Sequence, residues 1–245
     1  MSNNKGVALV TGAAQGIGRA IALRLAEDGF DVAVNDVSSK SENLDTLVEE
    51  IQKKGRASSK HIADVSQDQQ VQTLVEEVVK NHGSLDVMVA NAAILGAPVP
   101  FIEVTAEDWD QVLAVNARGA FLCYKYAGIQ MIKQGRGGRI IGISSLAGKQ
   151  GTEFALGSHN RAQSVHWPPV ELGAHQITVN AVAPGVIDTP LLGGSPLLEQ
   201  MKQASPLKRL GLPEDIASLV SFLASKESQF ITGQTISSNG GLFFD

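Results

Sequence analysis

The chain has 245 residues, of which 43% are hydrophobic and 18% charged, and its formal net charge is −5. This length and composition are typical of a globular protein with a sizeable core. No cluster of Lys and Arg offsets the negative charge, which argues against a protein that binds nucleic acid. The single cysteine, Cys123, excludes an internal disulfide and fits a reducing compartment.

The amino terminus and the apolar runs predict a cytoplasmic protein. The opening sequence, MSNNKGVALV, lacks the basic segment and the long apolar segment of a signal peptide. No apolar run approaches the ~20 residues that a membrane-spanning helix needs. We therefore expect no membrane partner.

Short β-branched apolar runs alternate with helical patterns along the whole chain. Buried strands are predicted at residues 6–10, 31–35, 85–90, 139–144 and 177–182. Helices are predicted between them, because apolar residues such as Ile17, Ile21 and Leu25 recur every four residues. Left-handed residues just past helix ends are expected at Gly29, Gly55 and Gly83.

Strands that alternate with helices predict βαβ units and a parallel sheet. Right-handed crossovers wind such a sheet into a doubly wound, three-layer α/β/α sandwich. No linker, repeat or low-complexity segment interrupts the pattern, so we expect one domain over residues 1–245.

The first predicted strand runs directly into the sequence TGAAQGIG, residues 11–18, which opens a helix. The first glycine permits a tight turn, the second lets the backbone approach a pyrophosphate, and the third lets the helix pack on the strand. The N–H groups and the dipole of the helix N-terminus attract phosphates. The predicted cofactor-binding residues of this loop are Gly12, Gln15, Gly16, Ile17 and Gly18.

Asp36 ends the second predicted strand, 18 residues beyond Gly18. An acid at this place can accept hydrogen bonds from the adenosine ribose of a dinucleotide. Its charge would repel a 2′-phosphate, which favours NAD over NADP. Two alternatives stay open: Asp36 can be a capping or turn acid, and the segment 38–40 (SSK) leaves NADP as a second cofactor.

Further motifs follow the glycine loop in order. They are ADV (63–65), ANAA (90–93), VNARG (115–119), ISSLAG (143–148), NAVAPGVIDTP (180–190), LPEDIA (212–217) and ITGQTISSNGG (231–241). Together with the loop, they make the chain resemble a classical short-chain dehydrogenase/reductase over nearly its whole length. The ANAA element departs from the family's pattern, because Ala90 stands in place of an Asn and Ala93 in place of a Gly.

The resemblance implies a Rossmann-like fold and a role for each matching residue. Asp64 and Val65 would contact the adenine, and Asn91 would help to hold the cofactor. Asn116 would hold a proton-relay water, and Ser145 would orient the substrate. The implied contacts on the nicotinamide side are Pro184, Gly185, Ile187 and Thr189. From the residues alone, Asn116 can also satisfy backbone groups in a helix kink, and Ser145 can be a capping hydroxyl.

Two longer stretches narrow the resemblance. TGAAQGIGRAIALRLAEDGFDVAVND and IIGISSLAGKQG are similar to acetoin (diacetyl) reductases and butanediol dehydrogenases. This implies an NAD-dependent oxidoreductase that interconverts a small secondary alcohol and ketone, of the acetoin and diacetyl kind, by hydride transfer. It also implies a homo-oligomer, either a dimer or a tetramer.

The proton donor that the family uses is missing from this sequence. Hydride addition to a ketone leaves a developing alkoxide, which needs a proton donor within hydrogen-bond distance. In the family the donor is a tyrosine, with a lysine four residues later that lowers the pKa of its phenol. The chain has only two tyrosines, Tyr124 and Tyr126, and both precede Ser145.

The residue that replaces the tyrosine depends on how the segment is aligned. Counting forward from ISSLAG sets His159 in the place of the tyrosine and Gln163 in the place of the lysine. Counting back from ELGAHQITVN sets Phe154 and Ser158 there instead. The two counts differ by about five residues, so the segment is shortened as well as altered.

Two adjacent prolines also interrupt the helix that the family has after this tyrosine. Pro168 and Pro169 fall in its expected interior, where each costs about 3 kcal/mol. We therefore predict an irregular segment over residues 152–170, with the helix ending before Trp167 and regular structure resuming near Glu171 or Ile177. Because related enzymes pair through this helix, the usual oligomer interface is in doubt.

Three explanations of the altered segment stay open. His159 can act as the acid, since an imidazole with a pKa of about 6.5 can donate a proton near neutral pH. Alternatively, the chain is a catalytically impaired or silent dinucleotide-binding protein with a regulatory or scaffolding role. Thirdly, residues 152–170 are a frameshifted or mis-spliced version of an ordinary active-site helix. No metal site is predicted, because His159, His166 and His175 lack both Cys partners and helical i, i+4 spacing.

Overall fold

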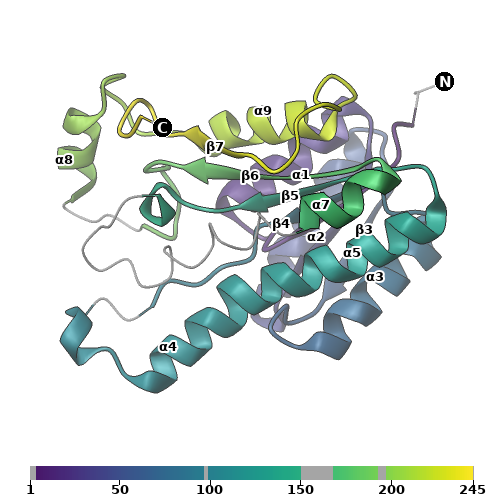
Figure 1. Ribbon diagram of the computed structural model, residues 1–245, viewed down its shortest axis with the longest axis horizontal. Coiled ribbons are helices and arrows are strands. Elements are labelled where there is room, and N and C mark those ends of the chain that lie inside the picture. Colours follow the sequence, from purple (N-terminus) through teal and green to yellow (C-terminus); the bar gives the residue numbers. More distant parts are fainter. Residues whose placement is uncertain (1–3, 97–98, 150–167, 193–196, 245) are drawn as a thin grey trace.

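Parallel strands form one seven-stranded sheet at the centre of the computed structural model, which describes residues 4–96, 99–149, 168–192 and 197–244 (Figure 1). The strands are β1 (Val7–Thr11), β2 (Asp31–Asp36), β3 (Ser58–Ile62), β4 (Val87–Ala90), β5 (Gly138–Ile143), β6 (Ile177–Pro184) and β7 (Thr235–Ser238). Their order across the sheet is β3-β2-β1-β4-β5-β6-β7. Because β1 pairs with both β2 and β4, the winding reverses beside β1. Open parallel sheets bind ligands at such a switch point, beyond the carboxyl ends of the strands.

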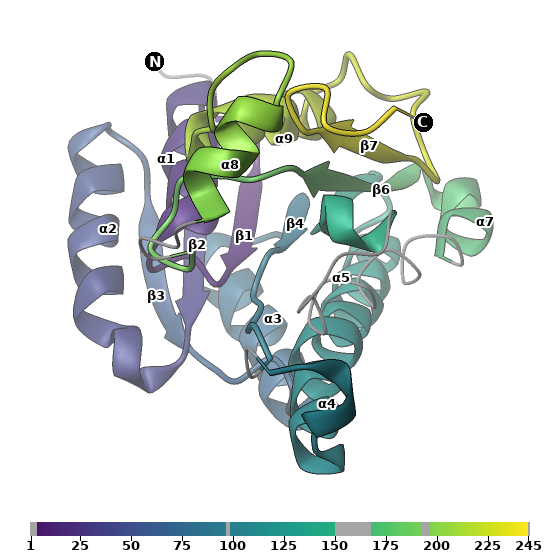
Figure 2. The same cartoon turned by 90° about the vertical axis from the view of Figure 1, so that its left-hand side faces the viewer.

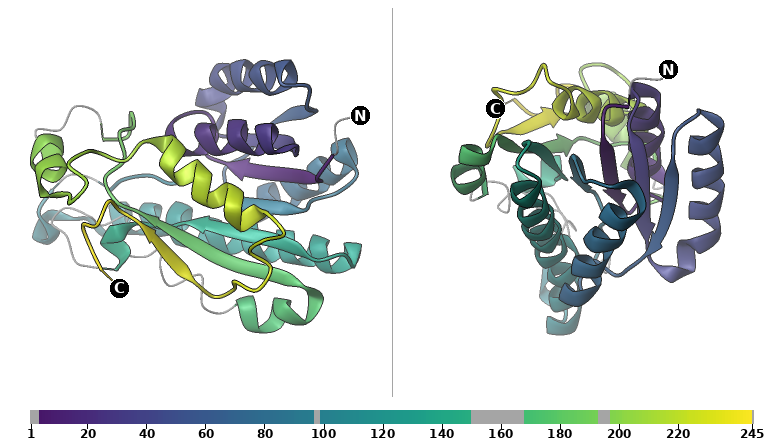
Figure 3. Two further views of the ribbon diagram at one scale, coloured as in Figure 1. Left: turned by 90° about the horizontal axis from the view of Figure 1, so that it is seen from above. Right: turned by 90° about the vertical axis from the view of Figure 1, so that its right-hand side faces the viewer.

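Helices cover both faces of the sheet, so the chain has the predicted doubly wound, Rossmann-like, three-layer fold in a single domain (Figure 3). One face carries α1 (Gly16–Asp28), α2 (Ser41–Lys53) and α9 (Pro213–Ala224). The other carries α3 (Asp68–His82), α5 (Ala120–Gln134) and α7 (Pro168–Leu172). A π-helical segment, Ala114–Gly119, joins α4 (Ala106–Leu113) to α5, and α8 (Leu197–Ala204) lies beyond the carboxyl ends of the strands (Figures 1 and 2). Short 3₁₀ turns occur at Ser38–Lys40, Phe101–Glu103, Leu146–Gly148 and Gly173–His175.

The sheet separates two hydrophobic cores. Val10 and Val34 face the core under α1, α2 and α9, whereas Leu9 and Met88 face the core over α3 and α5. Successive residues of one strand point to opposite faces, so Leu9 and Val10 lie in different cores although they are neighbours. Because both faces are covered, the central strands consist of almost continuous apolar runs.

The apolar runs predicted the inner strands correctly and missed the two edge strands. β1, β2, β4, β5 and β6 coincide with the five predicted strands to within two residues at each end. β3 has the sequence SSKHI and β7 the sequence TISS, and both lie at an edge of the sheet, where polar side chains are tolerated. The predicted left-handed residues are confirmed at Gly29, Gly55 and Gly83, whose φ angles are 104°, 78° and 87°.

The adjacent prolines do not break regular structure where the sequence suggested. Pro168 and Pro169 are the first two residues of α7, so helical structure is present earlier than the expected Glu171. A proline fits the start of a helix, because the N–H group that it lacks has no intrahelical partner there. The predicted irregular segment 152–170 is thus wrong for its last three residues. Residues 152–167, and with them the predicted helix end before Trp167, lie outside the described residues.

The part of the chain that the structure describes contains no helix long and apolar enough to span a lipid bilayer.

Candidate functional site

A large cavity opens at the switch point, beyond the carboxyl ends of the strands. Its volume is about 830 Å³, and it extends from the end of β2 across the glycine loop to the segment after β6. Every residue that the sequence assigned to cofactor binding lines it, namely Gly12, Gln15, Gly16, Ile17, Gly18, Asp36, Asp64, Val65, Asn91, Pro184, Gly185, Ile187 and Thr189. Asn116 and Ser145 also line the cavity. The tertiary structure therefore brings all the described candidates together around one space of the size expected for a cofactor with its substrate.

The glycine loop adopts a backbone that only small residues allow. Gly12 has φ +63°, and a Cβ added there would lie 2.7 Å from Cα of Ala92. Gly16 has φ +55° and begins α1, so that the free N–H groups of this helix lie at the cavity. A Cβ on Gly18 would overlap the carbonyl oxygen of Gly12. The third glycine thus allows α1 to pack against the turn itself, a closer approach than the predicted one of helix on strand.

Asn91 holds this loop in place. Its Nδ2 donates to the carbonyl oxygens of Thr11 and Gly12, both at 3.0 Å. In return, Oγ1 of Thr11 accepts the backbone N–H groups of Asn91 at 3.1 Å and Ala92 at 3.2 Å. Asn91 therefore ties the end of β4 to the end of β1, which makes it a positioning residue for the phosphate loop.

The carboxylate of Asp36 is anchored at the end of β2. Its Oδ2 accepts the backbone N–H of Ala14 at 3.1 Å, and its Oδ1 accepts that of Val37 at 2.9 Å. Asp36 is thus the turn acid of the alternative interpretation, yet it also lines the cavity. Because an ionised carboxylate has about four acceptor sites, these two bonds leave room for ribose hydroxyls. Lys40 lines the same end, where its Nζ donates to Oε1 of Gln15 at 3.1 Å.

The predicted adenine segment is braced from α3. The backbone N–H of Asp64 donates to Oε1 of Gln70 at 2.8 Å, and Oδ1 of Asp64 accepts the backbone N–H of Ser66 at 2.9 Å. Val65 packs against Gly119, where an added Cβ would lie 2.8 Å from Cγ2 of Val65. These contacts set the position of the segment at the rim of the cavity.

Asn116 lies in the π-helical segment and is 1% exposed. Its Oδ1 accepts the backbone N–H of Ile94 at 2.9 Å, and its Nδ2 donates to the carbonyl oxygen of Ile94 at the same distance. The side chain therefore satisfies backbone groups, as the alternative interpretation expected, but those of the loop after β4 and not those of a helix kink. A single π turn in a helix occurs frequently at functional sites, and here it brings Asn116 to the cavity wall.

Ser145 follows β5 and caps a 3₁₀ turn. Its Oγ accepts the backbone N–H of Ala147 at 3.1 Å, which is the capping role that the alternative interpretation proposed. A hydroxyl can donate one hydrogen bond while accepting another, so this contact leaves the donor function for a substrate oxygen. Lys149, four residues later, is directed elsewhere: its Nζ donates to the carbonyl oxygen of Thr235 at 2.7 Å and to Oγ of Ser237 at 3.0 Å.

The segment after β6 closes the opposite side of the cavity. A Cβ on Gly185 would lie 2.8 Å from Cα of Asn239, so only glycine allows this approach to the carboxyl end of β7. Cγ2 of Thr189 would lie 3.4 Å from a Cβ on Gly16, which shows how closely the segment approaches the glycine loop. Sequence reasoning missed several apolar residues that line the cavity, because no motif marks them: Ile94 and Leu95 after β4, and Leu191 and Leu192 after β6.

The described cavity wall contains no tyrosine and no histidine. Tyr124 is 3% exposed and its hydroxyl lies against Gly142, whereas the hydroxyl of Tyr126 donates to Oδ1 of Asp68 on α3 at 2.9 Å. Neither tyrosine therefore lines the cavity, where a proton donor for the substrate would be needed. His159, the residue that the sequence offers for this role, lies outside the described residues. In the described part of the chain no group of histidine, cysteine and acidic residues could hold a metal ion.

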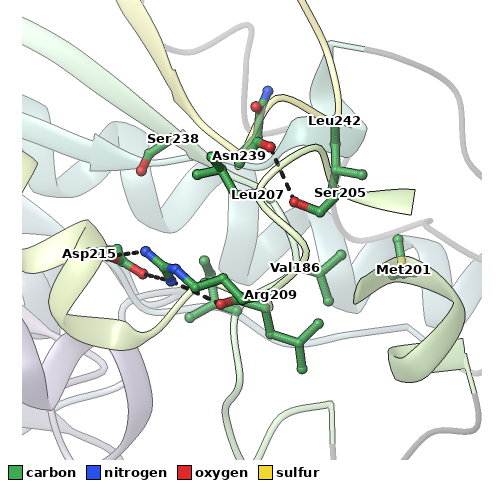
Figure 4. A pocket seen from close by; sticks show the side chains of 14 residues that line it. Val186, Met201, Ser205, Leu207, Arg209, Asp215, Ser238, Asn239 and Leu242 are labelled. Carbon is green, nitrogen blue, oxygen red and sulfur yellow. Dashed lines mark hydrogen bonds and ion pairs between the residues drawn. The ribbon is translucent and has the colours of Figure 1, made fainter. Parts of the chain in front are cut away.

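A second, smaller cavity lies behind the segment after β6 (Figure 4). Its volume is about 240 Å³, and Met201, Leu207 and Leu242 form its apolar wall. Its charged groups are already paired, since Nη1 and Nη2 of Arg209 donate to the two carboxylate oxygens of Asp215 at 2.6 and 2.9 Å. Hydrogen bonding to Arg209 lowers the pKa of Asp215. The described residues of this cavity wall therefore offer no unpaired charge that would bind a cofactor.

Sequence relatives match the chain along almost its whole length. The profile of the family described as enoyl-(acyl carrier protein) reductase matches residues 12–243. A short-chain dehydrogenase/reductase of Armillaria gallica is 48% identical over 252 aligned positions, covering 98% of this chain and 96% of the relative. A 3-oxoacyl-[acyl-carrier-protein] reductase of Staphylococcus aureus is 42% identical, with 96% and 97% covered.

Solved structures agree with these relatives. The acetoin dehydrogenase of Enterobacter cloacae superposes with a TM-score of 0.87 at 35% identity, covering 99% of this chain and 96% of the other. A blue fluorescent protein from a metagenomic library, in complex with NADPH, superposes with a TM-score of 0.91 at 33% identity over the full length of both chains. Family profile, relatives and fold lead to one conclusion: this chain belongs to the short-chain dehydrogenase/reductase family and is an oxidoreductase by descent.

Proposed function

We propose that the chain is an NAD-dependent oxidoreductase that interconverts a small secondary alcohol and ketone of the acetoin and diacetyl kind. The observation that carries the proposal is the 830 Å³ cavity, which is lined at one end by the glycine loop and Asp36 and at the other by Ser145. Such a space accommodates a dinucleotide with a small substrate beside it. The likeness to an acetoin dehydrogenase supports this choice of substrate.

The choice of NAD rests on Asp36. Its carboxylate is fixed by the backbone N–H groups of Ala14 and Val37 at the site expected for the adenosine ribose. A fixed negative charge would accept ribose hydroxyls and repel a 2′-phosphate. Lys40 at the same end of the cavity is the feature that favours NADP as a second cofactor, and one structural neighbour holds NADPH.

The proposed chemistry assigns one task to each of three residues. The bound nicotinamide supplies or accepts the hydride. The Ser145 hydroxyl donates to the substrate oxygen and orients the carbonyl carbon, and Asn116 keeps the neighbouring wall in position through Ile94. His159 as an imidazolium gives its proton to the oxygen as the ketone becomes an alcohol, and takes it back in the reverse direction. By analogy with the family, we also propose a cytoplasmic homo-oligomer, a dimer or a tetramer.

Turnover and binding, measured side by side, test the proposal. We expect NADH oxidation with diacetyl or acetoin, and NADH binding by calorimetry. The rival function, a silent dinucleotide-binding protein, is the outcome in which NADH binds but no carbonyl in a broad panel is reduced. His159→Phe should lower turnover by about 10²–10⁴-fold if His159 is the acid. His175→Phe, at an exposed histidine, should leave it unchanged.

Two further measurements separate the remaining alternatives. Asp36→Ala should weaken NADH binding, whereas Asp110→Ala, at an exposed acid on α4, should not. Equal affinities in both variants would overturn the ribose assignment and, with it, the preference for NAD. Resequencing the transcript across codons 145–175 tests the frameshift explanation, since an in-frame Tyr-x-x-x-Lys would remove His159 from the mechanism.

A further inference from the structure

Two histidines meet at one serine hydroxyl between β3 and α3, away from the residues assigned to the reaction. Oγ of Ser59 lies 2.8 Å from Nε2 of His61 and 2.7 Å from Nε2 of His82. On the other side of its ring, Nδ1 of His61 lies 3.2 Å from Oε2 of Glu77. Ser59 and His61 belong to β3, whereas Glu77 and His82 belong to α3. We call these four residues the histidine clamp, because their hydrogen bonds join the strand to the helix.

The hydrogen bonds of the clamp form one complete chain only when the ring of His61 is neutral. A carboxylate accepts, so Nδ1 of His61 carries a proton and donates to Glu77. Nε2 of His61 then accepts the Ser59 hydroxyl proton, and Oγ of Ser59 accepts from Nε2 of His82. A further proton on His61 would direct two N–H groups at one oxygen. The hydroxyl proton of Ser59 would then lose its acceptor.

The surroundings of the clamp also disfavour charge on the rings. Burial is the main reason why the pKa of His61 lies below its ordinary value, and the neighbouring Glu77 only partly opposes this effect. Burial likewise lowers the pKa of His82, where Asp31 of β2 acts in the opposite direction and His61 adds to the lowering. The carboxylate of Asp31 is itself paired with the buried Arg56, at 2.8 Å.

Lys60 is the remaining charged group of β3, and its ammonium group is paired at 2.6 Å with Asp45 on α2. Its charge is therefore compensated within the α2 layer. Both histidines are accordingly neutral near neutral pH.

The clamp adjoins the adenine end of the cavity. Nδ2 of Asn35 donates to the carbonyl oxygens of His61 at 3.2 Å and Ala63 at 3.1 Å. A hollow of about 160 Å³ is lined by residues of the clamp, His61 and Glu77, and also by Ala63 and Gln70. Gln70 of α3 in turn accepts the N–H of Asp64, a residue of the cavity wall. A shift of α3 against β3 would therefore move the support of Asp64.

We propose that the histidine clamp makes dinucleotide binding sensitive to acid: neutral, it holds α3 against β3 and supports the adenine rim, and protonated, it releases both. The part that concerns the dinucleotide rests on the proposed function. The sign follows from linkage. A histidine whose pKa is lower in the folded state stabilises the fold above its unfolded pKa of about 6.5, and this contribution is lost as the pH falls through the folded pKa. The affinity for the dinucleotide should therefore also fall as the pH falls.

Calorimetric NADH titrations between about pH 8 and about pH 5.5 test the proposal, since this range spans the ordinary histidine pKa. Wild-type affinity should fall by about fivefold or more on acidification. The double variant His61→Gln/His82→Gln, which has no imidazole ring to protonate at the clamp, should lose much less affinity. His175→Gln, at an exposed histidine, should behave like the wild type. An affinity that stays constant over this range in the wild type would overturn the proposal.

Histidine ring resonances supply a readout that does not depend on the variants. Linkage is reciprocal, so saturating NADH should lower the pKa of His61. A His61 pKa that NADH does not move would refute the coupling. If NADH fails to bind even at about pH 8, the proposed function has failed. The clamp itself is then tested by unfolding. If it acts as proposed, the free energy of unfolding of the wild type falls on acidification, whereas that of the double variant does not.

Discussion

At the scale of single residues, close approach of backbone to backbone decides which side chains the site accepts. Gly18 allows α1 to touch the carbonyl group of Gly12, and Asn91 fastens that same turn through two hydrogen bonds of 3.0 Å. The glycine loop is thus held from two sides before any ligand arrives. Such preorganisation reduces the ordering that binding would otherwise require.

The Gly18→Ala variant tests this packing. Its Cβ would overlap the Gly12 carbonyl oxygen and lie 2.5 Å from Nδ2 of Asn91, so we expect a loss of about 1–3 kcal/mol in the free energy of unfolding. NADH affinity should fall with it, because the turn is displaced. Gly173→Ala is the matched control, since a Cβ there meets no atom within 4 Å. Urea unfolding and calorimetry measure both, and equal stability of the two variants would contradict the packing argument.

At the scale of elements, the π-helical segment between α4 and α5 connects a helix to the cavity wall. The wider turn Ala114–Gly119 presents Asn116, whose amide pairs with both backbone groups of Ile94. The loop after β4 therefore takes its position from a helix 22 residues away in sequence. The same side chain lines the cavity, so the stability of this loop and the shape of the site are linked.

Asn116→Ala should cost about 1–3 kcal/mol in the free energy of unfolding, because two backbone groups of Ile94 lose their partners. Hydrogen exchange of the Ile94 amide should accelerate more than exchange elsewhere in the sheet. A general loss of stability would instead accelerate exchange over the whole sheet. Asn43→Ala, at an exposed position of α2, should change stability by no more than about 0.5 kcal/mol. Slow exchange at Ile94 in the Asn116 variant would show that the loop is held by other contacts.

At the scale of the whole molecule, the covered sheet buries groups that are reactive elsewhere. Cys123 lies on α5 in the core over α3 and is 1% exposed. Burial raises the pKa of its thiol to about 12. Since the thiolate is the nucleophile, this cysteine is a structural residue in the folded protein and becomes reactive only when the core opens.

Thiol labelling of Cys123 should therefore report global unfolding. In native buffer we expect iodoacetamide to react at least about 10³-fold more slowly than in concentrated urea. This factor of about 10³ is the lower limit of the folding equilibrium constant of a stable domain. The labelling rate should follow the unfolding equilibrium across the urea transition. Rapid labelling without denaturant would mean that the core over α3 and α5 opens locally.

Much of the fold could be predicted from the sequence, because its inner strands are covered on both faces. Their apolar runs are therefore continuous and easily recognised. The edge strands β3 and β7 were missed, since half-exposed strands carry polar residues that resemble loops. Pro168 and Pro169 were misplaced for a different reason: sequence position does not reveal whether a proline lies inside a helix or at its first turn.

The sequence by itself determined the family, the alternation of the inner strands with helices and the motif residues of the candidate site, because apolar runs and short motifs record these locally. Only the tertiary structure decided which groups these residues bind by hydrogen bonds. Asn91 and Asn116 pair with backbone groups about 80 and 22 residues away in sequence, and the histidine clamp joins residues 59 and 82. Hydrogen bonds of this kind depend on distances in space, which the packing of helices on the sheet sets and no local pattern records.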